Sequence, residues 1–348
     1  MLRTLCRFIR SRRPVARASA RLIGILALGL AGAFSLSKGK AGATVPCRLT
    51  QTIALPNVKG RIDHCAVDLA GERLFVCALG NNSLEVIDLR KGERIRSIAG
   101  LGSPQGVAYL PESNRLVVTN DRDGRCNFYD GKSFALTGTV DLKDDADNAR
   151  YDASSRQLYV GYGRGGIAVI NPAAQKVAAI ELSAHPEAFV LEKNGPRIFV
   201  NLPGAGQVAV VDRVQATVVA RWEMGAAAGN FPMAFDEAHH RLFVGCRSPA
   251  ELVVLNSDSG ATVTTIPIPA DVDDVFYDGP QYRLFAICGG GSIAVIDQVT
   301  PNSYRMIATI PTASGARTGL FVPALNSLCV AVPQRGGKDA EVRRYALE

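Results

Sequence analysis

The chain contains 348 residues, of which 47% are hydrophobic and 20% are charged, and its formal net charge is +7. Seven Arg, two Lys and no acidic residue fall within the first 43 residues, so subtracting these nine positive charges leaves −2 for the remainder. The Lys and Arg of that remainder are scattered along the chain, which argues against nucleic acid or an anionic membrane surface as a partner.

The N-terminal segment has the layout of a secretory signal. Basic residues are followed by an apolar run over residues 22–36 and then by the small residues Ala41 and Ala43. The run is too short and too rich in Gly and Ala for a membrane span. We therefore expect residues 1–43 to be a cleaved signal peptide. Residues 44–348 should form a single domain that is periplasmic or secreted and is not inserted in a membrane.

Two export routes fit this signal. Arg12 and Arg13 precede a weak apolar run, which resembles a twin-arginine signal, although Val15 and Ala16 replace the bulky residues preferred there. Ordinary secretion is the alternative that the sequence leaves open. The route matters because twin-arginine export carries folded proteins, often already loaded with a cofactor or metal.

Seven cysteines follow residue 43, and their odd number and wide spacing do not form a disulfide framework. Several end an apolar string, as Cys77 ends RLFVC and Cys288 ends RLFAIC. A free cysteine in such a place behaves as a small buried hydrophobe. We expect thiols of the core rather than metal or redox roles.

An apolar, β-rich string such as RLFV recurs seven times at intervals of 40 to 44 residues. We call its second residue the anchor of each repeat. The anchors are Leu74, Leu116, Leu158, Ile198, Leu242, Leu284 and Leu328. This period, together with alternating β-branched residues and no long helical periodicity, is typical of four-stranded propeller blades. The sequence therefore predicts an all-β, seven-bladed β-propeller.

The two ends of the chain complete one blade in this prediction. The seventh repeat ends at EVRRYALE without a fourth strand, and an unassigned strand over residues 48–56 precedes the first repeat. That strand would fill the gap in blade seven and leave no unpaired edge where the ring closes.

The repeat also resembles a known family. Val118-Thr119-Asn120 within RLVVTN, and the string VIDLRKGERI from Val86, resemble the YVTN-repeat propellers, which include lactonase-like seven-bladed proteins. The resemblance covers essentially all of residues 44–348. It implies the architecture and, as activities, hydrolysis, lyase chemistry or plain binding. Lactonase-like propellers often hold a divalent ion with Glu, Asn and Asp side chains.

Function is expected where equivalent positions carry different polar residues. Ten to thirteen residues before the anchors, at the expected start of the innermost strands, lie Asp63, His64, Gln105, Asp147, Asn148, His185, Glu187, Asn230, Asp273, Asp274 and Arg317. Innermost strands line the channel, so these side chains should form a polar ring, with Arg247 and Arg335 on its rim. Such a ring is a candidate binding site, although any one member could simply bind water and cap a strand end.

Oxygen ligands dominate one part of the ring. Asp147, Asn148, Glu187, Asp273 and Asp274 suit a hard divalent cation such as Ca²⁺. A zinc site is harder to build, because His64 and His185 belong to blades one and four and should lie nearly opposite each other.

The remaining ring residues suggest catalytic and binding roles. His64, oriented by Asp63, is the candidate general base, and His185 and Arg317 complete the expected catalytic set. The residues expected to bind substrate are Gln105, Asn230, Arg247, Arg317 and Arg335. Arg317 would pair with an anionic group. We expect a monomer that binds a small, anionic molecule, with metal-assisted hydrolysis of a lactone or ester as the reaction. The alternative is a non-enzymatic scaffold that binds a peptide, a polymer or a partner protein.

Overall fold

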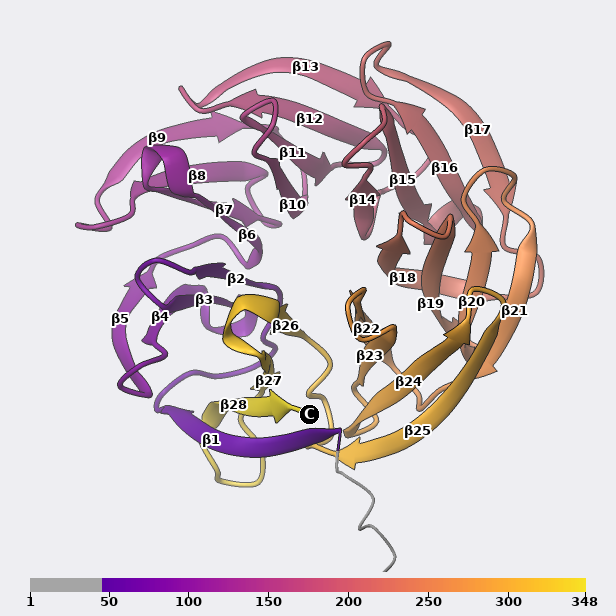
Figure 1. The fold of residues 1–348 in the computed structure, drawn as a ribbon. Coiled ribbons are helices and arrows are strands. Elements are labelled where there is room, and N and C mark those ends of the chain that lie inside the picture. The colour runs from indigo at the N-terminus through magenta and orange to yellow at the C-terminus, as the bar shows by residue number, and fades with distance from the viewer. Residues whose placement is uncertain (1–45) are drawn as a thin grey trace, which may run out of the picture. The chain divides into compact units, whose positions relative to one another are not determined.

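The computed structural model describes residues 46–348, and within them seven four-stranded antiparallel sheets surround a central channel (Figure 1). Each predicted repeat supplies one blade, so the predicted all-β, seven-bladed propeller is confirmed. The signal peptide predicted at residues 1–43 lies outside the described residues. Over residues 46–348, no helix has the length and apolar character needed to cross a membrane.

Each blade runs from an innermost strand at the channel to an outermost strand at the rim. Blade 1 contains, in that order, β2 (Cys65–Asp68), β3 (Arg73–Ala78), β4 (Ser83–Asp88) and β5 (Glu93–Ala99). Blade 2 contains β6 (Pro104–Leu110), β7 (Arg115–Asn120), β8 (Arg125–Asp130) and β9 (Leu136–Asp141). Blade 3 contains β10 (Ala146–Asp152), β11 (Gln157–Tyr162), β12 (Gly166–Asn171) and β13 (Gln175–Glu181). Blade 4 contains β14 (Phe189–Leu191), β15 (Arg197–Leu202), β16 (Gln207–Asp212) and β17 (Thr217–Glu223).

The other three blades complete the ring. Blade 5 contains β18 (Ala228–Asp236), β19 (Arg241–Ser248), β20 (Ala250–Asn256) and β21 (Thr262–Pro267). Blade 6 contains β22 (Val272–Asp278), β23 (Arg283–Cys288), β24 (Ser292–Thr300) and β25 (Ser303–Pro311). Blade 7 contains β26 (Gly319–Val322), β27 (Ser327–Val332), β28 (Ala340–Leu347) and β1 (Cys47–Leu55). Single 3-10 turns lie at Leu79–Asn81, Pro111–Ser113, Pro203–Ala205 and Pro323–Leu325.

The anchor strings form the second strand of every blade and are buried on both faces. In β3, every residue after Arg73 is buried, because this strand lies between two neighbouring blades. A strand covered on both faces reads as a continuous apolar run rather than as an alternating one. The outermost strand β17, by contrast, alternates exposed and half-buried residues. The core is accordingly divided among the contacts between blades, as in the cluster that joins Phe75 and Leu84 of blade 1 to Val107 and Leu116 of blade 2.

The ring is closed by pairing between the two ends of the domain, as the sequence predicted. Strand β1 pairs antiparallel with β28, with Cys47 opposite Leu347 and Leu55 opposite Ala340. Figure 1 shows the indigo β1 beside the yellow β28 at the outer edge of blade 7. Ile53 and Leu55 are buried in the cluster between blades 7 and 1. The N-terminal strand therefore contributes core contacts as well as backbone hydrogen bonds.

The seven cysteines of the described residues are free, and all except the half-buried Cys65 are buried. Burial raises the pKa of Cys47 to about 12, and it raises that of Cys126 to about 12 with a small contribution from Asp123. These thiols therefore stay protonated and unreactive at neutral pH, as expected for core residues.

The closure makes a direct prediction about stability. Ile53, which is 1% exposed, packs in the closing cluster, whereas the adjacent Thr52 is exposed. We expect Ile53→Ala to lower the free energy of unfolding by about 2–4 kcal/mol, because it leaves a cavity where the ring closes. The control Thr52→Ala should change it by less than about 0.5 kcal/mol. Urea denaturation followed by fluorescence measures both, and equal effects would contradict the role of β1 in the core.

Candidate functional site

Successive side chains face the channel at the start of the innermost strands, and in four blades a bulge lies at this point. The pairing of β6, β10, β18 and β22 with their second strands shifts register within their first few residues. A bulge adds one unpaired residue and redirects neighbouring side chains. Eleven residues before the anchors stand Asp63, Gln105, Asp147, Glu187, Phe231, Asp273 and Arg317, and one position later stand His64, Gly106, Asn148, Ala188, Pro232, Asp274 and Thr318.

These positions surround a polar cavity of about 160 Å³ at one end of the channel, which we call the mouth. Nine predicted site residues line it: Asp63, His64, Gln105, Asp147, Asn148, His185, Glu187, Arg247 and Asp273. Asp274 lines the channel just inside the mouth. Arg317 contacts the wall of the mouth through Asp273, and Arg335 lies in the connection between β27 and β28. The structure therefore brings together most of the predicted ring.

Blades 2 to 4 form an acidic side of the mouth around His185. Its Nε2 atom lies 3.6 Å from Oδ2 of Asp147, and its Nδ1 atom lies 3.6 Å from Oδ2 of Asp145 and 2.6 Å from the carbonyl oxygen of Gly163. Gln105 donates to Asp145 through a 2.9 Å hydrogen bond. One ligand atom each of Asp147, His185 and Glu187 lie within 4.8 Å of one another. This triad has the donor types and the spacing of a metal site.

The acids of this side outnumber the cations among them, since Asp145, Asp147 and Glu187 surround the single His185. Burial raises the pKa of Glu187 to about 7, and the nearby Asp147 contributes in the same direction. Burial also raises the pKa of Asp145 to about 6, although His185 lowers it. For His185, burial lowers the pKa, but its contacts with Asp147, Gly163 and Asp145 outweigh this effect and raise it to about 9. The acidic side therefore favours any added positive charge.

The opposite side of the mouth is an arginine side centred on Asp273. Arg247 donates to Oδ1 of Asp273, while Nε of Arg317 lies 3.4 Å and Nη2 of Arg61 lies 3.9 Å from its Oδ2 atom. Arg317 also donates to Asp271 at 2.8 Å. All three guanidinium groups are thus already paired with carboxylates, so an anion on this side would compete with aspartate.

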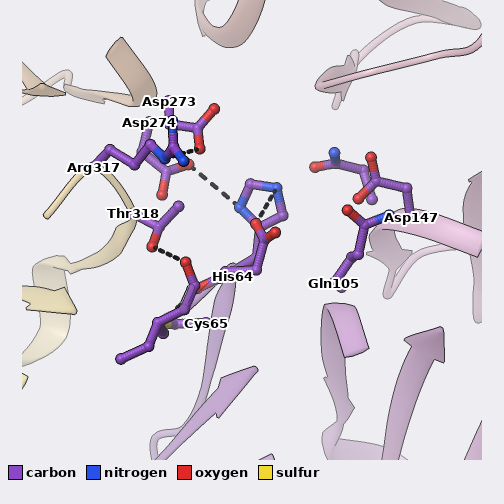
Figure 2. Close-up of polar contacts among 12 residues, drawn as sticks. His64, Cys65, Gln105, Asp147, Asp273, Asp274, Arg317 and Thr318 are labelled. Atoms are coloured by element: carbon purple, nitrogen blue, oxygen red, sulfur yellow. Dashed lines mark hydrogen bonds and ion pairs between the residues drawn. The ribbon is translucent and has the colours of Figure 1, made fainter. Parts of the chain in front are cut away.

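His64 lies between two carboxylates. Its Nε2 atom is 3.7 Å from Asp63 and its Nδ1 atom is 3.6 Å from Asp274, and Figure 2 shows the imidazole ring on the side of Asp274. Burial lowers the pKa of His64, but Asp274 and Asp63 outweigh burial and raise it to about 10. The ring is therefore protonated at neutral pH, where it offers a proton and a positive charge rather than a base.

Asn230, expected to bind substrate, faces away from the mouth. It lies twelve residues before its anchor, where the other blades carry Ile, Pro, Ala or Val, and it is fully buried. Its amide donates to Oδ1 of Asn201 at 3.2 Å and to the carbonyl oxygen of Gln207 at 2.9 Å. Asn230 therefore joins blade 5 to blade 4. Phe231 takes the ring position in its place, with the guanidinium of Arg247 3.9 Å from its ring centre.

Three charged residues of the site were missed from the sequence: Arg61, Asp145 and Asp271. Each precedes a ring residue by two positions, and extended backbone places residues two apart on the same face. His185 was found at this same spacing before Glu187. Applying that spacing to every blade would have identified all three.

Comparisons with known proteins support the fold and leave the activity open. No protein-family model matches the sequence. A segment of 97 residues is 28% identical to an uncharacterised protein, YncE, of Salmonella typhi, and covers 28% of this chain and 27% of that protein. The match thus spans about a quarter of the relative's length. The seven-bladed propeller is supported, while the YVTN-repeat family itself is not confirmed by a family model.

Solved structures of other proteins have the same architecture. A chain of the Kuenenia stuttgartiensis hydrazine synthase superposes with a TM-score of 0.73 at 15% identity, over 84% of this chain and 98% of that one. The WD40 repeats of RRP9 give 0.75 at 12% identity, over 86% and 99%. A chain of the mitotic checkpoint complex gives 0.69 at 13% identity, over 90% and 98%. At such identities the likeness shows the fold alone.

The raised pKa of His64 predicts a pH dependence of stability. Because the pKa is raised in the folded state, the stabilisation is fully present below about pH 6.5 and is lost as the pH rises through about 10. We expect the destabilisation caused by His64→Gln to shrink by on the order of 3 kcal/mol between pH 6 and pH 10. Denaturant unfolding of both proteins across that range measures it.

The control for this prediction is His240→Gln. The His240 side chain is 55% exposed and lies in the turn between β18 and β19, away from the mouth. Its effect on stability should be small, because exposed side chains of this kind contribute little to folding. A pH-independent effect of His64→Gln would show that the contacts with Asp63 and Asp274 do not hold the proton.

Proposed function

We propose that this protein is an exported binding propeller that holds a divalent metal ion at Asp147, His185 and Glu187 and uses it to bind a small anionic molecule at the mouth. The observation that carries the proposal is the convergence of these three side chains, whose ligand atoms lie within 4.8 Å of one another. They come from two neighbouring blades, so the rigid ring positions them before any ion arrives.

The surroundings of His185 fit a metal ligand. Its Nδ1 atom is within hydrogen-bond distance of the Gly163 carbonyl, which leaves Nε2 on the side of Asp147. Metal-bound histidines commonly donate their second N–H to a backbone carbonyl in this way. One imidazole with two carboxylates suits a transition-metal dication better than Ca²⁺, which prefers oxygen ligands alone. Asp273 and Asp274, expected as calcium ligands, make their contacts with arginine and histidine instead.

The distribution of charge supports the same site. On the arginine side, Arg61, Arg247 and Arg317 are matched by carboxylates. On the acidic side, the carboxylates of Asp145, Asp147 and Glu187 share one histidine. A dication there would replace the protons that Glu187 and His185, with their raised pKa values, retain. An anionic ligand would then bind the ion without displacing an aspartate from an arginine.

Binding fits this geometry better than hydrolysis. Hydrolysis of a lactone or ester, which the resemblance implies, requires a base beside the activated water. His64, the expected base, has a pKa raised to about 10, and Glu187 serves as a metal ligand. The cavity of about 160 Å³ has room only for a small group beside the ion, such as the anionic end of a ligand.

Metal analysis tests the proposal. Purified protein is loaded separately with Zn²⁺, Mn²⁺ or Ca²⁺, dialysed and analysed by inductively coupled plasma mass spectrometry. We expect about one equivalent of a transition metal in the wild type and at least about a tenfold loss in Asp147→Asn, Glu187→Gln, which keeps the side-chain shape but removes two charged ligands.

The matched control is Glu181→Gln, Asp339→Asn, which makes the same charge change at two exposed positions. It should bind metal like the wild type. A folded wild type that retains none of the three ions would refute the metal site, and retention of Ca²⁺ alone would restore the all-oxygen site expected from the sequence.

A further inference from the structure

Inside the mouth, the channel continues as a cavity of about 460 Å³ that we call the inner channel. Eight residues before the anchors, six blades carry an apolar residue, including the small Ala66, Ala108 and Ala234. Blade 3 carries Arg150 at the same position, on β10. A single cation therefore lies at a level of the channel where the other six blades are apolar.

The guanidinium of Arg150 has no acidic partner among residues 46–348. It donates to the carbonyl oxygen of Ala149 at 2.9 Å and to the amide oxygen of Asn148 at 3.2 Å, both neutral acceptors. It lies 5.6 Å from the ring centre of Phe189. No carboxylate of the described part of the chain comes within 4.0 Å of it, in contrast to Arg61, Arg247 and Arg317 at the mouth. A guanidinium has five N–H donors, so hydrogen-bonding capacity remains for a ligand.

We propose that the inner channel binds a small organic anion whose carboxylate pairs with Arg150 and whose apolar body packs against the channel wall. An unpaired cation in an apolar wall costs free energy that a bound anion would offset. Burial lowers the pKa of Arg150, and the carboxylates of Asp274 and Asp147, which raise it, do not outweigh burial. The guanidinium fork suits a carboxylate through two parallel hydrogen bonds.

The walls match the rest of such a ligand. Tyr109, Phe276 and Leu320 line the cavity together with the small alanines, while His64 and Asp274 line it next to the mouth and pair with each other. Apart from that pair, the wall around Arg150 is mainly apolar and aromatic. The volume of about 460 Å³ lies within the range of small-molecule sites, roughly 300–1,000 Å³. The ligand class is therefore a monocarboxylate with an aromatic or compact aliphatic body.

A second opening gives the ligand a route that does not pass the metal site. Arg150, Tyr151 and Tyr277 also line a wide cavity of about 1180 Å³, whose other residues include Asp152 and Asp278 at the far ends of the innermost strands. The inner channel thus opens at the end opposite the mouth. Anion binding at Arg150 can therefore occur whether or not the mouth holds an ion.

Isothermal titration calorimetry with benzoate, and with uncharged benzamide as its isostere, tests this site. We expect the wild type to bind benzoate with a Kd below about 5 mM and benzamide at least about tenfold more weakly. Arg150→Met should weaken benzoate binding at least about tenfold and leave benzamide unchanged. Without ligand, this variant should melt no lower than the wild type, because it removes an unpaired cation.

Two further variants keep the result interpretable. Arg221→Met, at an exposed position of β17, is the matched control and should bind benzoate like the wild type. Arg150→Lys keeps the charge but loses the fork, so it should bind several-fold more weakly than the wild type and more tightly than Arg150→Met. If Arg150→Met does not fold, the lysine variant decides, and affinity equal to that of the wild type would overturn the proposal.

The remaining outcomes separate this site from the metal site. The Asp147→Asn, Glu187→Gln variant should keep its affinity for benzoate, since its changes lie at the mouth. Loss of benzoate binding in that variant would place the anion on the metal and overturn the inner-channel site. A wild type with no benzoate binding below about 5 mM, or equal affinity in Arg150→Met, would overturn it as well.

Discussion

The pairing of β1 with β28 is the constraint on which the channel depends. The apolar clusters pack each blade against its neighbours, so the ring closes only when blade 7 is complete and packs against blade 1. The hydroxyl of Thr318 then bonds the carbonyl of Ile62 at 3.2 Å, which ties the starts of the two innermost strands together across the closure. His64 of blade 1 can reach Asp274 of blade 6 only because this junction is closed. Opening of the junction between blades 7 and 1 would therefore also disrupt the site.

The closed ring also explains how so many ionisable groups come together in a small volume. Seven equivalent positions converge on the channel, and in blades 2, 3, 5 and 6 a bulge at the start of the innermost strand redirects neighbouring side chains there. Stability comes mainly from the apolar strings between blades, so the ring positions can vary without disturbing the core. The apolar residues that hold the blades together are thus different residues from the polar ones that line the channel.

Much of the propeller and its ring of polar residues could be predicted from the length of the sequence repeat alone. A fixed distance from each anchor identified Asp147, Glu187 and Asp273 as ring residues, and the incomplete seventh repeat identified β1. Asn230 was misplaced because a bulge shifts the register by one residue, and only the structure shows whether Asn230 or Phe231 faces the channel. The pairing of Arg317 could not be predicted either, since its partner Asp271 comes from the loop before blade 6.

Asn148 and Asp274 differ in charge, and this difference decides whether the cation beside each of them is neutralised. These residues occupy the same position in blades 3 and 6, directly after a ring aspartate. In blade 6 the carboxylate pairs with His64 and accepts from the Gly319 amide at 2.8 Å, so its charge is compensated. In blade 3 the neutral amide of Asn148 positions Arg150 without neutralising it. A carboxylate at 148 would have closed an ion pair two residues along the strand, whereas the amide holds the guanidinium in place and leaves its charge unpaired.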